Sequence, residues 1–82
     1  MPDNSSTIVV KPLHMYVQEV TYSDEDGVLD FIVEYGTGGQ LLVWSHDIPA
    51  PIREKVLNAM TDWATHRSFP VKLEVIEGFR PN

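Results

Sequence analysis

The 82-residue sequence predicts a small α+β domain, a sandwich of one helix packed on one face of an antiparallel-rich sheet. Two changes of pattern carry this prediction. Apolar residues recur at every second position in the first half of the chain, and they recur at spacings of three and four from residue 51 onward. A last segment returns to period two. The expected order is therefore strand, strand, strand, helix, strand, within a single domain spanning residues 1–82.

The first strands are expected between residues 7 and 35. Thr7–Lys11 is rich in β-branched residues, but Pro12 cannot donate a ladder hydrogen bond, so this segment is at most a short edge strand. Leu13–Tyr22 is the first strand of the main sheet, and the turn segment SDEDG joins it to Val28–Tyr35. The odd-numbered apolar residues of this second strand should face the core.

The glycine-rich segment GTGG leads into Gln40–Ser45, which completes a three-stranded antiparallel meander. Pro51–Arg67 is predicted to be a helix, and Pro70–Glu77 alternates as a final strand. Residues 1–6 are expected to form a flexible arm and residues 78–82 a tail. The helix has one apolar stripe, which consists of Ile52, Val56, Ala59, Met60, Trp63 and Ala64.

Composition excludes several functional classes. The chain has no cysteine, which removes disulfides and thiolate chemistry and fits a reducing cytoplasm. The net charge is -6, and no lysine or arginine occurs between Lys11 and Arg53. Without a cationic stripe, direct binding of nucleic acid or of a membrane surface is not expected, whereas a protein partner with a basic surface is. No segment has the pattern of a membrane span or a signal peptide, so we expect a cytoplasmic protein.

Two motifs suggest an active site, and neither fits the chemistry. A phosphate-binding glycine loop must lead into a helix, but GTGG leads into a strand, so it is expected to be a turn. Ser45, His46 and Asp47 have the residue types of a hydrolytic triad, but consecutive side chains of an extended chain point to opposite faces. We expect His46 or Asp47 to bond backbone groups between strand and helix instead.

No metal or other cofactor is predicted. His14, His46 and Asp47 could meet in space, but their spacing is not that of a metal site. A small ligand-binding or catalytic domain that uses these three residues, with Glu34, in a pocket at the end of the sheet remains an alternative function.

The acidic hairpin, defined as Asp24, Glu25 and Asp26, is expected to be a solvated turn. It lacks the alternating ligand pattern of a calcium loop. A second alternative is that these acids, with Glu19, Asp30 and Glu34, mimic the phosphates of a nucleic acid and so block a nucleic-acid-binding protein.

The most informative prediction concerns the sheet face that one helix cannot cover. By the assigned register this face carries an apolar patch of Val28, Ile32, Leu42, Trp44 and Ile76, edged by the charged residues Asp30, Glu34, Lys72 and Glu74. An apolar centre with a charged rim is the usual composition of a protein interface. Either the patch binds a partner, or the chain covers it with residues 7–12 or its C-terminal tail, or Trp44 points inward. The predicted interface residues are Ile32, Leu42, Trp44 and Ile76, with Asp30 and Glu34 orienting the partner.

These observations predict a small acidic, non-enzymatic protein-binding module that acts through the sheet face and the acidic hairpin. Its partner is either a second copy, in a homodimer, or another protein with a basic surface. Small acidic domains of this kind suit an inhibitor or accessory factor, including those encoded by phages and mobile elements.

Overall fold

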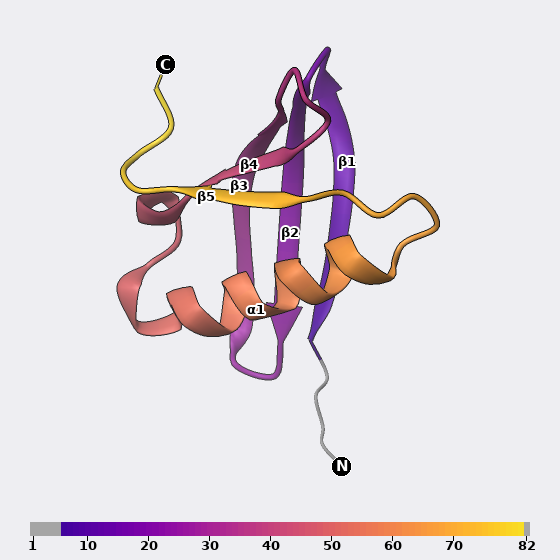
Figure 1. Ribbon diagram of the computed structural model, residues 1–82. Coiled ribbons are helices and arrows are strands. Elements are labelled where there is room, and N and C mark those ends of the chain that lie inside the picture. The colour runs from indigo at the N-terminus through magenta and orange to yellow at the C-terminus, as the bar shows by residue number, and fades with distance from the viewer. Residues whose placement is uncertain (1–5, 82) are drawn as a thin grey trace.

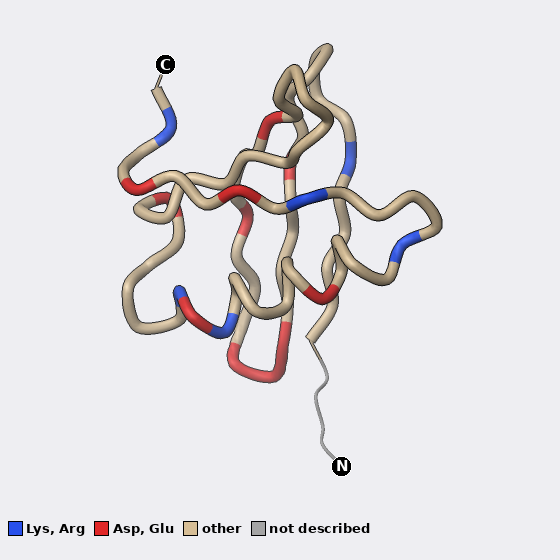
Figure 2. The backbone as a smooth tube through the Cα atoms, in the orientation of Figure 1, with Lys and Arg blue, Asp and Glu red and all other residues tan. Residues whose placement is uncertain are grey.

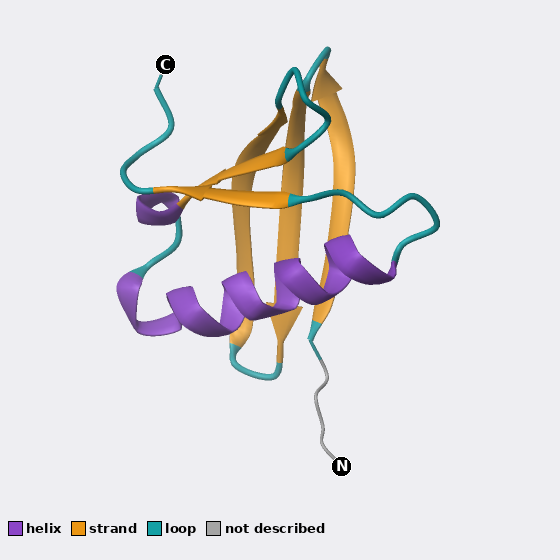
Figure 3. Cartoon of the chain, in the orientation of Figure 1, coloured by secondary structure: helices purple, strands orange, loops and turns teal. Residues whose placement is uncertain are grey.

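Five strands form one mixed sheet in the computed structural model, which describes residues 6–81. The strands lie side by side in chain order, and all neighbours are antiparallel except β4 and β5, which are parallel. A single α-helix crosses one face of the sheet (Figures 1 and 3), which confirms the predicted α+β architecture. The elements are β1 (Thr7–His14), β2 (Val17–Asp24), β3 (Gly27–Tyr35), β4 (Leu41–Trp44), the 3-10 helix η1 (Ser45–Asp47), α1 (Ala50–His66) and β5 (Leu73–Ile76).

The N-terminal part of the sheet differs from the sequence prediction in one boundary. The predicted strand Leu13–Tyr22 is two strands, because a two-residue turn at Met15 and Tyr16 separates β1 from β2. The predicted edge strand Thr7–Lys11 is real and longer, and it passes through Pro12 with an irregular register before His14. Pro12 is tolerated there because β1 lies at the edge of the sheet.

This turn was missed because it lacks turn chemistry. Met15 occupies its first central position with a φ of 50°, a conformation that glycine adopts far more readily. The turn after β2 does follow the expected rule, since Gly27 has a φ of 149° and begins β3.

The core lies between the sheet and α1. Phe31 and Val33 of β3 are buried toward the helix, as their odd-numbered positions predict, and Leu41 and Val43 of β4 are fully buried beside them. Leu42 and Trp44 therefore belong to the opposite face of β4. The central core cluster consists of Val20, Tyr22, Phe31, Val33, Leu41, Val43, Ile48, Val56 and Met60.

Helix α1 begins and ends one residue before the predicted bounds, at Ala50 and His66. Three residues of the predicted stripe, Val56, Met60 and Ala64, are buried, and the other three are half-buried. The strand predicted over Pro70–Glu77 is shorter, because the chain first turns back and the Val71 amide donates to the Ala64 carbonyl at 3.2 Å.

Within the described residues, no helix is both long enough and apolar enough to cross a membrane. The predicted arm, residues 1–6, lies outside the described part of the chain except for Ser6, which is exposed.

Candidate functional site

The sheet face opposite α1, called here the outer face, brings together the apolar residues that were predicted to form an interface. Val33 pairs with Val43 and Glu34 with Leu42, so the next step along both strands places Ile32 beside Trp44. Trp44 in turn pairs with Ile76 of β5. The four apolar residues therefore occupy two neighbouring rows across β3, β4 and β5. Val28, which was predicted to belong to the same patch, does not join these rows, because it lies beyond Asp30 on β3 and pairs with Ser23 of β2. We call the set of Ile32, Leu42, Trp44 and Ile76 the outer patch.

The outer patch is only partly open to solvent. Ile32, Leu42 and Ile76 are half-buried, whereas Trp44 is only 8% exposed. Trp44 does not point under the helix, because it faces away from the buried Val43 at its side. Its indole is therefore shielded by neighbours on the outer face.

The C-terminal tail is bonded to residues that flank the outer patch. Its backbone is tied to the segment after Trp44, since the His46 amide donates to the Gly78 carbonyl at 2.9 Å. Arg80 then reaches β3, where its Nε donates to Glu34 Oε2 at 2.7 Å. The tail thus links the β5 side of the sheet to β3 at the level of the outer patch. This position of the tail favours the alternative in which the chain itself covers part of the patch.

Carboxylates border the outer patch. Glu34 is paired with Arg80, and Asp30 is exposed and accepts a hydrogen bond from Thr21 Oγ1 at 2.7 Å. Glu74 of β5 pairs with Leu42 in the ladder and is exposed as well. The border of the patch therefore carries more negative charge than positive charge.

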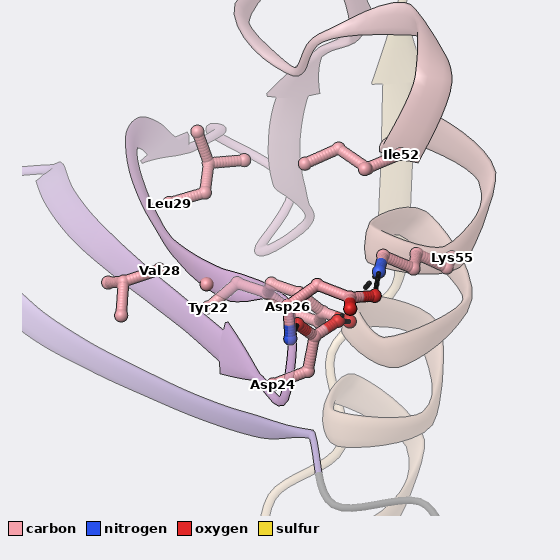
Figure 4. Close-up of a pocket in the computed structure, with 8 residues that line it drawn as sticks. Tyr22, Asp24, Asp26, Val28, Leu29, Ile52 and Lys55 are labelled. Carbon is pink, nitrogen blue, oxygen red and sulfur yellow. Dashed lines mark hydrogen bonds and ion pairs between the residues drawn. The ribbon is translucent and has the colours of Figure 1, made fainter.

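The acidic hairpin is not simply a solvated turn, because it is bonded to α1 (Figure 4). Lys55 Nζ lies 2.8 Å from Asp24 Oδ2 and 3.1 Å from Asp26 Oδ2. The hydroxyl of the buried Tyr22 also donates to Asp24 Oδ2, at 2.6 Å. The three acids form the red segment at the β2–β3 turn in Figure 2. Of the three, only Glu25 is exposed and takes no part in these bonds.

These bonds explain the titration of the cluster. The Lys55 hydrogen bond, followed by that from Tyr22, lowers the pKa of Asp24 to about 2. The bond to Asp24 raises the pKa of Lys55 above its usual range, and burial, followed by the bond to Asp24, raises that of Tyr22. A cavity of about 120 Å³ adjoins the cluster, with Leu29 and Ile52 in its wall. A lysine held protonated in this way is a poor nucleophile or base, so we interpret the cluster as a clasp between hairpin and helix.

The clasp predicts a specific pH dependence. Asp24 has a lower pKa in the folded protein than its ordinary 3.8, so its contribution to stability is complete above pH 3.8 and is lost as pH falls through about 2. We expect Asp24→Asn to be less stable than the wild type at pH 7, and the difference to shrink between pH 4 and pH 2. Urea unfolding across this range measures it. Glu25→Gln is the matched control, and a wild-type advantage over Asp24→Asn that stays constant down to pH 2 would contradict the assignment.

The Ser45-His46-Asp47 string forms the short helix η1 rather than the extended segment that was predicted. We expected His46 or Asp47 to bond the backbone here with its side chain, and neither does so to any residue within 6–81. Among the described residues it is Ser45 that does so, since its Oγ accepts from the Gly78 amide at 3.4 Å. The His46 ring instead contacts Phe79 edge-on, with ring centroids 5.3 Å apart.

His14 is not close to the other residues of the proposed catalytic alternative. It ends β1, and two strands separate β1 from β4, which amounts to roughly 14 Å at the usual strand spacing. No group of three histidine or acidic side chains in the described chain could hold a metal ion. The structure therefore does not assemble His14, His46 and Asp47 into one site.

The glycine-rich turn is shaped by Gln40. The Gly36 amide donates to the Gln40 carbonyl at 2.8 Å, and the Gln40 side chain folds over the loop. A Cβ atom at Gly36 or Gly38 would come within 2.9 Å of that side chain, and Gly39 has a φ of 84°. These contacts agree with the prediction that GTGG is a turn.

The sequence prediction missed the exposed apolar tip of the β1–β2 hairpin. Leu13, Met15 and Tyr16 are 51%, 74% and 65% exposed. A prediction of one continuous strand over Leu13–Tyr22 hides this exposure, and the poor alternation of that segment is the signal in the sequence that points to the turn.

Comparison with protein-family models, with curated proteins and with solved structures gives no match for this chain.

Proposed function

We propose that this protein is a non-enzymatic protein-binding module whose outer patch docks on a partner with a basic surface. The observation that carries the proposal is the contiguity of the outer patch on the sheet face that α1 leaves uncovered. A tryptophan among aliphatic side chains, bordered by charged residues, is the composition of an interface centre.

The charge around the patch specifies the chemistry of the partner. Asp30 and Glu74 are exposed at its border, and the whole chain has a net charge of -6. A complementary surface would present lysine or arginine around an apolar centre. Long-range attraction of this kind raises the association rate and weakens with added salt.

The tail gives the partner a point of entry. The Arg80–Glu34 pair is partly exposed, with side-chain exposures of 26% and 31%, so a cationic side chain of a partner can compete with Arg80 for Glu34. Loss of this pair would release the tail from β3 and open the route to Trp44. An ion pair between the partner and Glu34 would replace the pair between Arg80 and Glu34, so the exchange would change the free energy little.

This function suits a cytoplasmic inhibitor or accessory factor, of the sort that phages and mobile elements encode. The cysteine-free composition supports the cytoplasmic assignment. Mimicry of a nucleic acid by the acidic hairpin has less support, because Lys55 already pairs with Asp24 and Asp26.

A matched set of charge insertions tests the proposal. Immobilised wild-type protein is used to capture partners from extract of the native host, and each captured protein is purified and titrated against the variants by calorimetry. Ile32→Lys and Leu42→Lys place a cation in the outer patch, and we expect each to weaken binding at least about ten-fold. Val28→Lys adds the same charge at a 70% exposed position of β3 that lies beyond Asp30 and outside the rows of the patch, so it should weaken binding much less than either patch variant.

Thermal melts confirm that the three variants are folded before the titrations are compared. Equal affinity for all of them, or affinity that does not change with salt, would contradict the proposal. Light scattering on the free protein tests the homodimer. A wild-type dimer that Ile32→Lys and Leu42→Lys convert to a monomer would show that the patch binds a second copy rather than a basic partner.

A further inference from the structure

The free edge of β1 lies next to a groove that α1 completes. The sheet ends at β1, so the outer side of this strand has backbone N–H and C=O groups that no other strand of the described chain pairs with. Figure 1 shows the C-terminal half of α1 crossing in front of β1. Between the two elements is a groove of about 210 Å³, lined by Ser6, Ile8, Ala59, Asp62 and Trp63.

The edge is protected unevenly. Proteins commonly block an exposed edge strand with lysine or proline, and both occur in the second half of β1, as Lys11 and Pro12. The first half, Thr7–Val10, has neither and consists of β-branched residues. The groove adjoins this unprotected half, because Ile8 lies in its wall.

We propose that the Thr7–Val10 edge binds an extended, basic segment of another protein by strand addition. An added strand would bond to the free backbone groups of β1, and its side chains would alternate between the two faces of the sheet. Those on the helix side would enter the groove beside Ile8 and Trp63. Those on the outer face would lie against Val9, which is 53% exposed.

Two features of the groove select the chemistry of the segment. Its apolar wall includes Trp63, whose ring is held by Arg67. The Arg67 guanidinium lies 4.6 Å from the Trp63 ring centroid and donates a hydrogen bond to the Tyr35 hydroxyl. Its polar wall is Asp62, a 76% exposed carboxylate whose ion-pair neighbour among the described residues is His66, charged only when protonated. A lysine or arginine on the helix side satisfies both walls, because its methylene stem packs on Ile8 and Trp63 while its charge pairs with Asp62. The alternate residues, which face Val9 on the outer face, should be apolar.

This site is separate from the outer patch, because β1 and β4 are at different positions in the sheet and the groove is on the helix side. Failure of one proposal therefore leaves the other standing.

The test uses a synthetic heptapeptide of alternating lysine and valine with blocked ends, titrated into the isotopically labelled protein. We expect NMR shift changes at the amides of Thr7–Val10 and at the indole N–H of Trp63. Two control peptides have the same side chains but N-methyl groups on alternate backbone nitrogens, one in each register. At least one of them should bind at least ten-fold more weakly, because N-methylation removes the donors that pair with the edge.

Protein variants test the selection for basic residues. Asp62→Asn should lower the affinity for the lysine–valine peptide several-fold. Glu54→Gln removes the same charge from an exposed position near the start of α1 and should leave the affinity unchanged. Equal binding of both N-methylated peptides, equal effects of the two variants, or shift changes centred on Ile32 and Leu42 would overturn the proposal. Binding that appears only after deletion of residues 2–5 would also overturn it, since that segment would then be the natural occupant.

Discussion

Met60→Ala is expected to lower the free energy of unfolding by roughly 2–5 kcal/mol, the range for removing a large buried aliphatic side chain. Met60 is fully buried on the side of α1 that faces the sheet and belongs to the central core cluster. Domains of this size have small cores, and total stabilities of about 5–15 kcal/mol are typical of folded proteins. The variant should therefore be close to unfolding at 37 °C. Urea unfolding monitored by circular dichroism measures the change.

Asn58→Ala is the matched control on the same helix, at an exposed position. Its stability should stay within about 0.5 kcal/mol of the wild type, because surface changes of this type are small. A Met60→Ala protein as stable as Asn58→Ala would show that α1 does not pack on the sheet through this residue.

Trp44→Ala is expected to lower the free energy of unfolding by roughly 3–5 kcal/mol, although Trp44 is on the outer face and not in the central core cluster. The reason is its 8% exposure, which means that removal of the indole leaves a cavity on this face. Trp44→Phe should restore part of the loss. Val28→Ala, at a 70% exposed position of the neighbouring strand, should change the stability by less than about 0.5 kcal/mol.

Equal stability of Trp44→Ala and Val28→Ala would mean that the indole is not shielded in solution. The expected loss also decides how binding is tested. Because Trp44→Ala should damage the fold, a loss of binding in that variant would be ambiguous. Ile32 and Leu42 are half-buried and are therefore the better probes of the outer patch.

Where periodicity was clear, the sequence predicted the elements closely. The helix bounds differ by one residue at each end, and the odd-numbered face of β3 is buried as expected. The contiguity of Ile32, Leu42, Trp44 and Ile76 also followed from alternation, because a strand with a known inner face has a known outer face. The β1–β2 turn could not be predicted in the same way. Met15 takes a left-handed φ without any of the residues that mark such turns.

Three properties depended on contacts between residues far apart in the sequence. Arg80 pairs with Glu34, Lys55 with Asp24 and Asp26, and the groove beside β1 is closed by Trp63 of α1. No local pattern specifies such pairs, because a side chain's partner is set by how the elements pack.

The amino-acid sequence alone determined the α+β class, the acidic character and the two faces of the sheet, because period and charge are local properties of a chain. The tertiary structure decided which of those features remain available to a partner. Trp44 was predicted as an exposed anchor and is shielded on the outer face, the acidic hairpin is tied to α1, and the edge of β1 is open. Exposure is a property of the packed molecule, and it is fixed only when strands, helix and tail have taken their places.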